Sequence, residues 1–253
     1  MRKIYIVPNL VTTANMFAGF YSIISSIQGD YMAASQAILA AIVFDSLDGR
    51  IARFARATSQ FGVEYDSLSD LVSFGVAPAI LMYQWSLNPF GRLGWICAFI
   101  YLACAALRLA RFNVTTSVLP KGYFQGIPSP GAAGMLVTYY IFVHSMEYDR
   151  YDLSYFNLIL SVFLGFLMVS TIPFPSFKDF NWRSRATFGY LMLAVLSLIF
   201  IVLEPTVTPF VILSGYVGAS LLWNLVRLIK GAKPLAVAEK SPLEKQQEKV
   251  SGK

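Results

Sequence analysis

Residues 32–54 read MAASQAILAAIVFDSLDGRIARF. Residues 32–44 are mostly apolar and carry no charge, and two aspartates and two arginines follow within residues 45–54. A helix of this length is long enough to cross the hydrocarbon core of a bilayer, which takes about 20 apolar residues. Asp45 and Asp48 would then lie toward one membrane interface. The stretch therefore predicts a membrane-spanning helix that carries carboxylates near one end.

The rest of the 253-residue chain has the same character, with 56% hydrophobic and 13% charged residues. Soluble domains carry roughly 25% charged residues. Apolar stretches recur between polar, Gly and Pro residues, at 10–27, 32–54, 66–85, 92–111, 131–147, 155–172, 186–203 and 209–229. We expect an all-α fold, a polytopic membrane bundle of about eight transmembrane helices over residues 1–230. Residues 231–253 are expected to form a polar, partly disordered cytoplasmic tail.

The basic residues predict the orientation, because cytoplasmic loops of membrane proteins are enriched in Lys and Arg. With the N-terminus in the cytoplasm, all 20 Lys and Arg residues except Arg92 and Arg150 fall in cytoplasmic segments. An even number of spans then places both termini in the cytoplasm. We expect a multi-pass protein of the cytoplasmic membrane. Its net charge of +6 suits anionic lipid headgroups, and nothing in the sequence indicates a nucleic-acid partner.

Four carboxylates follow helical spacing around the first cytoplasmic connection. Asp45 and Asp48 are i and i+3 on one span, and Asp66 and Asp70 are i and i+4 on the next. The short connection predicts antiparallel neighbouring spans, so the four acids should converge near the cytoplasmic ends. Two like charges 4 Å apart repel by about 4 kcal/mol at an effective dielectric of 20. Because the same helix faces carry no basic residue, we expect a divalent cation to balance the charge of the acids. An all-oxygen site suits Mg²⁺ or Mn²⁺, and we expect two ions.

The residues around these acids are suited to holding a nucleotide diphosphate. Small residues leave the helix surface bare beside the acids, and an arginine at the helix end can reach a phosphate. The candidate residues for binding this group are Gly49, Ala52, Arg53, Gly62, Asn9 and Thr12. We expect Gly62 to lie in the connecting loop. Asn9 and Thr12 could equally form the cap and first turn of the first span.

Residues 45–70 match the pattern D-x2-D-G-x2-A-R-x8-G-x3-D-x3-D at every fixed position. In this the chain resembles the CDP-alcohol phosphatidyltransferases. The resemblance implies that Asp45, Asp48 and Asp66 ligate metal and that a CDP group is held by Gly49, Ala52, Arg53 and Gly62. It also implies that Asp70 is the general base, close to or within the metal site.

Four further segments, residues 73–79, 107–113, 124–130 and 167–178, resemble one branch of that family. This branch contains the membrane-embedded CDP-diacylglycerol–serine O-phosphatidyltransferases. The resemblance implies CDP-diacylglycerol and L-serine as substrates, CMP as leaving group, and a homodimer. The activity would be a metal-dependent single displacement at the cytoplasmic surface.

The acceptor pocket must hold the carboxylate and the ammonium group of serine. Arg111 and Asn113, at the cytoplasmic end of the fourth span, are the first candidates, and Lys178 is the next. Anchoring at the membrane interface is the alternative role for these cations.

Two other functions remain open from the residues alone. The acceptor could be glycerol 3-phosphate or inositol phosphate, although such an acceptor calls for a denser basic cluster. A divalent-cation transporter could also use intramembrane acids, but these should be spread through the membrane depth. The single histidine, His144, excludes a mechanism that needs two histidines for a covalent phosphohistidine.

Overall fold

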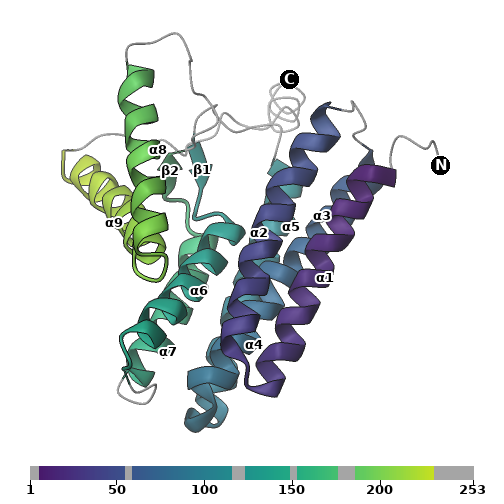
Figure 1. The fold of residues 1–253 in the computed structure, drawn as a ribbon, viewed down its shortest axis with the longest axis vertical. Coiled ribbons are helices and arrows are strands. Elements are labelled where there is room, and N and C mark those ends of the chain that lie inside the picture. Colours follow the sequence, from purple (N-terminus) through teal and green to yellow (C-terminus); the bar gives the residue numbers. More distant parts are fainter. Residues whose placement is uncertain (1–5, 55–58, 116–122, 149–152, 176–185, 231–253) are drawn as a thin grey trace, which may run out of the picture.

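The computed structural model describes residues 6–54, 59–115, 123–148, 153–175 and 186–230, which are almost entirely helical (Figure 1). The α-helices in these ranges are α1 Ile6–Gln28, α2 Tyr31–Phe54, α3 Gln60–Asp70, α4 Ala77–Met82, α5 Arg92–Thr115, α6 Ser129–Ser145, α7 Ser154–Val169, α8 Ala186–Leu203 and α9 Thr208–Ile229. Each apolar stretch predicted from the sequence is helical, so the all-α class is confirmed.

Several of these helices have the length and composition of membrane spans. The candidates in the described ranges are Pro8–Gln28, Tyr31–Ile51, Arg92–Val114 and Thr208–Ile229. Helix α7 is apolar but shorter. Large apolar side chains such as Phe17, Phe99 and Phe166 are exposed on the helix surfaces, as expected of a face in contact with lipid. These features fit an integral membrane protein, whereas eight spans and the orientation remain predictions.

The third helical segment begins earlier than the sequence suggested, at Gln60, and runs without a break through α3 and α4. A π-helical turn, Leu71–Val76, joins the two, and a second one, Tyr83–Leu87, follows α4. A π-helical turn changes the hydrogen-bonding pattern of a helix and often marks a functional region. Here the buried hydroxyl of Tyr101, from α5, donates to the carbonyl of Phe74 at 3.2 Å.

Helix α1 packs along both α2 and the third segment. Two serine hydroxyls of the third segment donate to α1 carbonyls, Ser69 to Thr12 at 3.0 Å and Ser73 to Asn15 at 2.9 Å. Opposite them, Gly19 allows close approach, since a Cβ there would overlap Ser73. Helix α1 therefore holds α2 and the third segment in one unit.

The turn between α1 and α2 is specified locally. Gly29 has a φ of +84°, a conformation that glycine adopts without strain. The next residue, Asp30, accepts a hydrogen bond of 2.9 Å from the backbone N–H of Ala33 and so caps α2.

The second half of the bundle has its core between α5, α6 and α7, while α8 and α9 lie at the opposite side of the molecule from α1 (Figure 1). The largest fully buried side chains in this half include Tyr101, Leu136, Leu164 and Met168. Two short antiparallel strands, β1 Tyr123–Gln125 and β2 Pro173–Pro175, pair beside the ends of α5 and α7. The sequence did not predict these strands, because each has only three residues, too few to show an alternation of polar and apolar side chains. Two of the three residues of β2 are prolines.

Candidate active site

The α2 acids lie where the helical spacing predicted. Asp45 and Asp48 share one face of α2, and Asp48 is buried, with 4% of its surface exposed. Asp66 comes from α3. Carboxylate oxygens of Asp45, Asp48 and Asp66 all lie within 4.8 Å of one another. The structure therefore brings these three predicted metal ligands together, and they could hold a metal ion.

The way α2 meets the third segment explains this arrangement. Helix α2 contacts the third segment mainly at residues 71–76 and α4 and not along α3. The two neighbours expected to be antiparallel therefore touch chiefly after Asp70. At the level of the acids, α1 packs on both helices instead. The carboxylates thus face one another across a space between α2 and α3, which is where a ligand could enter.

The electrostatics of this cluster fit a divalent ion. Three carboxylates at this separation repel one another strongly in a partly buried site. In the part of the chain that the structure describes, Oδ1 of Asp66 is buried without a hydrogen-bond partner. A buried acceptor left in this way is costly unless a cation or water satisfies it. The donor set contains only oxygen, which suits Mg²⁺ or Mn²⁺.

Two side chains of α1 hold the acids in place. The hydroxyl of Thr12 donates to Oδ2 of Asp48 at 3.1 Å, and the amide of Asn15 donates to Oδ1 of Asp70 at 3.1 Å. Both α1 residues are buried. Sequence reasoning named Thr12 but missed Asn15, whose signal was an amide in an apolar span, one helical turn after Thr12.

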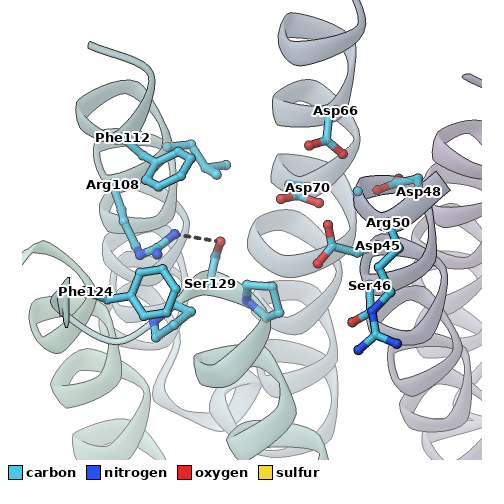
Figure 2. A pocket seen from close by; sticks show the side chains of 14 residues that line it. Asp45, Ser46, Asp48, Arg50, Asp66, Asp70, Arg108, Phe112, Phe124 and Ser129 are labelled. Atoms are coloured by element: carbon cyan, nitrogen blue, oxygen red, sulfur yellow. Dashed lines mark hydrogen bonds between the residues drawn. The ribbon is translucent and has the colours of Figure 1, made fainter. Parts of the chain in front are cut away.

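A cavity of about 610 Å³ opens beside the carboxylates. Asp45, Asp48, Asp66 and Asp70 form one wall, and residues of α5, β1 and the start of α6 form the other (Figure 2). In Figure 2 the second wall carries Arg108, Phe112, Phe124 and Ser129. Asp70 lies outside the close group of three acids but borders the same space.

The candidate nucleotide residues are divided between two sides of the acids. Gly49 lines the cavity. Gly62 lies in the first turn of α3 and not in the connecting loop as predicted, and its N–H donates to the helix cap Ser59 at 3.0 Å. A Cβ at Gly62 would lie 3.7 Å from Oδ1 of Asn9, so these two residues adjoin on the α1 side. The side chains of Ala52 and Arg53 lie outside the described part of the structure.

The candidate serine-binding residues are engaged with the protein itself. The guanidinium of Arg111 donates to backbone carbonyls at the end of α7, Val169 at 2.8 Å and Ser170 at 3.2 Å. The amide of Asn113 donates to the Ser67 hydroxyl at 3.0 Å and so joins α5 to α3. Lys178 lies outside the described residues. Two arginines that were not among the candidate site residues line the cavity, Arg50 on α2 and Arg108, one turn before Arg111 on α5.

Residues 5–203 match the CDP-alcohol phosphatidyltransferase family, and the chain therefore belongs to this family. The resemblance drawn from the acidic pattern is thereby confirmed.

The chain is also similar to proteins of one branch. A CDP-diacylglycerol–serine O-phosphatidyltransferase of Helicobacter pylori strain J99 is 36% identical over 229 residues, covering 90% of this chain and 93% of the relative. The enzyme of the same name from Methanocaldococcus jannaschii is 38% identical over 179 residues, 71% of this chain and 78% of the relative. An archaetidylserine synthase of Methanothermobacter thermautotrophicus is 37% identical over 170 residues, 66% of this chain and 69% of the relative.

Proposed function

We propose that this protein is a CDP-diacylglycerol–serine O-phosphatidyltransferase, which transfers the phosphatidyl group to the hydroxyl of L-serine and releases CMP. The observation that carries the proposal is the group of three carboxylates within 4.8 Å beside a cavity. Membership of the family and the similarity to serine enzymes over 90% of the chain supply the reaction class and the acceptor.

Asp45, Asp48 and Asp66 are the residues that would hold the divalent metal, Mg²⁺ or Mn²⁺, with Asp70 at the edge of the site. We expect two ions. A bound divalent ion neutralises the diphosphate and stabilises CMP as it leaves. Thr12 fixes the carboxylate of Asp48 for this task through its hydrogen bond.

Asp70 acts as the general base. Its Oδ1 accepts from Asn15, which leaves Oδ2 to take the proton of the serine hydroxyl. The serine oxygen forms a bond to the phosphorus that carries diacylglycerol as the bond from that phosphorus to the CMP oxygen breaks. CMP leaves with the bonding pair, and the proton ends on Asp70. This single displacement inverts the configuration at phosphorus, and a trapped phosphatidyl-enzyme would contradict it.

The CDP group occupies the small-residue face beside the acids. Gly49 and Ala52 leave room against α2, Arg53 pairs with a phosphate, and Gly62 with Asn9 contacts the nucleotide from the α1 side. Thr12 belongs to this set through its position between the nucleotide and Asp48. The acyl chains stay in the bilayer while the headgroup reaches the cavity.

The proposed membrane arrangement is the one that the apolar segments and the distribution of basic residues predict. Eight helical segments cross the membrane, both termini lie in the cytoplasm, and the active site faces the cytoplasm. Two copies form a homodimer. Residues 1–230 form the membrane domain, and the polar cytoplasmic tail expected over residues 231–253 lies outside the described residues.

The cavity also bears on the choice of acceptor. Among its lining residues, the basic ones are Arg50 and Arg108. A phosphorylated acceptor carries more negative charge and calls for more cations than a serine carboxylate does. Clustering of the acids at one end of the helices argues against a transport path, which needs polar groups through the membrane depth.

The test uses the purified protein in detergent with CDP-diacylglycerol and Mn²⁺ or Mg²⁺. Labelled serine, glycerol 3-phosphate and inositol phosphate are offered separately, and CMP release is measured. Release that depends on serine supports the proposal. Release that depends on another acceptor, or no release with any of them, contradicts it.

A further inference from the structure

Arg108 is a buried cation on the cavity wall that faces the acids. Its side chain comes from α5, and only 8% of its surface is exposed. One guanidinium nitrogen, Nη1, donates to the hydroxyl of Ser129 at 3.1 Å. In the described part of the chain, Nε is buried without a hydrogen-bond partner.

This state of a guanidinium is costly by itself. A buried charge needs a counter-charge or a full set of hydrogen bonds. Among the described residues Arg108 has one neutral hydrogen-bond partner, and the carboxylate that attracts it, Asp70, lies across the cavity without a hydrogen bond to it. The neighbouring Arg111 is different, because its donors are engaged with carbonyls of α7 and β1. An anionic ligand that enters the cavity would complete the hydrogen bonding of Arg108. The guanidinium fork suits a carboxylate in particular, because two parallel N–H groups match its two oxygens.

The position of Arg108 fixes which end of a ligand it can meet. In Figure 2 it lies across the cavity from Asp70, Asp66 and Asp45, next to Phe112 and Phe124. A ligand in this space therefore meets a cation at one side and the acids at the other. Serine has this polarity, with a carboxylate at one end and a hydroxyl that must reach Asp70 at the other.

We infer that Arg108, oriented by Ser129, binds the carboxylate of the acceptor serine and thereby selects serine over amino alcohols without a carboxylate. The inference rests on the proposed function and deepens it. It assigns recognition of the acceptor to Arg108, in the turn of α5 that precedes Arg111 and Asn113. An acceptor without a carboxylate leaves the buried guanidinium unpaired, and such a loss is expected to cost the enzyme about 10²- to 10⁴-fold in selectivity.

Arg108→Lys tests the inference, because lysine keeps the charge and loses the fork. We expect the KM for serine to rise about tenfold or more, with the KM for CDP-diacylglycerol changed less than twofold. The preference for serine over serinamide, as the ratio of kcat/KM values, should fall by a similar factor. Arg92→Lys is the matched control, since Arg92 is exposed at the far end of the same helix, and should change none of these values.

Three outcomes overturn the inference. The first is an unchanged KM for serine in Arg108→Lys, and the second is a rise confined to the KM for CDP-diacylglycerol, which would assign Arg108 to the donor phosphate. The third is a larger loss of serine preference in Arg50→Lys, since Arg50 is the other basic residue that lines the cavity. If wild-type protein releases no CMP with serine, the proposed function fails instead, so the two failures are distinguishable.

A measurement on the wild-type protein covers the case in which Arg108→Lys does not fold. Phenylglyoxal modifies guanidinium groups, and mass spectrometry of the digested protein locates the modified arginine. We expect serine to protect Arg108 at concentrations where serinamide does not, and Arg92 to be modified equally under both conditions. Equal protection of Arg108 by serine and serinamide, or no protection by serine, overturns the inference.

Discussion

The amide of Asn15 donates a 3.1 Å hydrogen bond to Oδ1 of Asp70, which joins the first helix to the proposed general base. Asn15 is fully buried, and its backbone carbonyl accepts from the hydroxyl of Ser73 at 2.9 Å. The side-chain amide is therefore held through its nitrogen by Asp70, while its own Oδ1 has no hydrogen-bond partner among the described residues. Because only one oxygen of Asp70 is used in this way, the carboxylate is held in one orientation toward the cavity.

Asn15→Leu should lower kcat with little change in the KM for either substrate. The leucine fills the space but leaves Asp70 free to rotate, and loss of a positioned general base costs about 10²- to 10⁴-fold. Steady-state kinetics in detergent measure this. Asn157→Leu is the control, because Asn157 is also fully buried and hydrogen bonded, to Tyr139 and Ser86, but lies away from the acids. It should lower the melting temperature, and kcat of the folded fraction should stay near wild type. Equal kcat losses in both variants would show a general packing effect.

Asp66→Asn should weaken metal binding, since it removes the negative charge of a ligand and replaces one carboxylate oxygen with an amide nitrogen, which does not bind the ion. A ligand that binds only the folded protein raises its melting temperature, so addition of Mn²⁺ should stabilise wild type and leave Asp66→Asn unchanged. Activity of the variant should fall at least about 10²-fold. Glu64→Gln is the matched control, because Glu64 is an exposed acid on the same helix. A Mn²⁺-induced shift that survives in Asp66→Asn but is lost in Glu64→Gln would contradict the proposed site.

Removal of metal with EDTA should abolish wild-type activity, and Mn²⁺ or Mg²⁺ should restore it.

Thr12→Val should raise the metal concentration needed for half-maximal activity by about 10- to 100-fold, the effect typical of losing a hydrogen bond to a ligand. The substitution keeps the shape and deletes the donor to Oδ2 of Asp48. Thr13→Val is the control, because the neighbouring hydroxyl is exposed and bonds to the carbonyl of Asn9 at 2.7 Å and to the hydroxyl of Tyr65 at 2.9 Å, but to no acid. A titration of activity with Mn²⁺ separates the two. If both variants titrate like wild type, Thr12 does not support the metal site.

Helical periodicity explains which parts of the site could be predicted from the sequence. The spacing of Asp45 and Asp48 places them on one face of a helix whatever that helix packs against, and charge repulsion then demands a cation. Apolar length predicted the helical segments for a similarly local reason. The positions of Asn15 and Arg108 depend instead on which face of α1 meets the acids and which face of α5 meets the cavity, and tertiary packing decides both. Gly62 was placed in the connection because the third apolar stretch begins only at residue 66, whereas the helix is capped by Ser59 and begins at Gln60.

Arg111 remains a predicted serine-binding residue from the sequence, and its contacts now give a competing prediction. Arg111→Gln removes the charged donors to the carbonyls of Val169 and Ser170, and each such hydrogen bond contributes about 1.5–3 kcal/mol. We expect a lower melting temperature in detergent, because the end of α7 loses these hydrogen bonds to α5. The KM for serine should stay within about twofold of wild type if these contacts are its main role.

The comparison variant for Arg111 is Arg92→Gln, which removes an exposed guanidinium from the same helix and should leave the melting temperature unchanged. A clear rise in the KM for serine, with the melting temperature of Arg111→Gln unaltered, would favour the role predicted from the sequence. It would also weaken the case for Arg108, since α5 would then present a different turn to the acceptor. Loss of stability without a change in the KM for serine assigns Arg111 to the packing of α5 against α7, and leaves Arg108 as the arginine of α5 that faces the cavity.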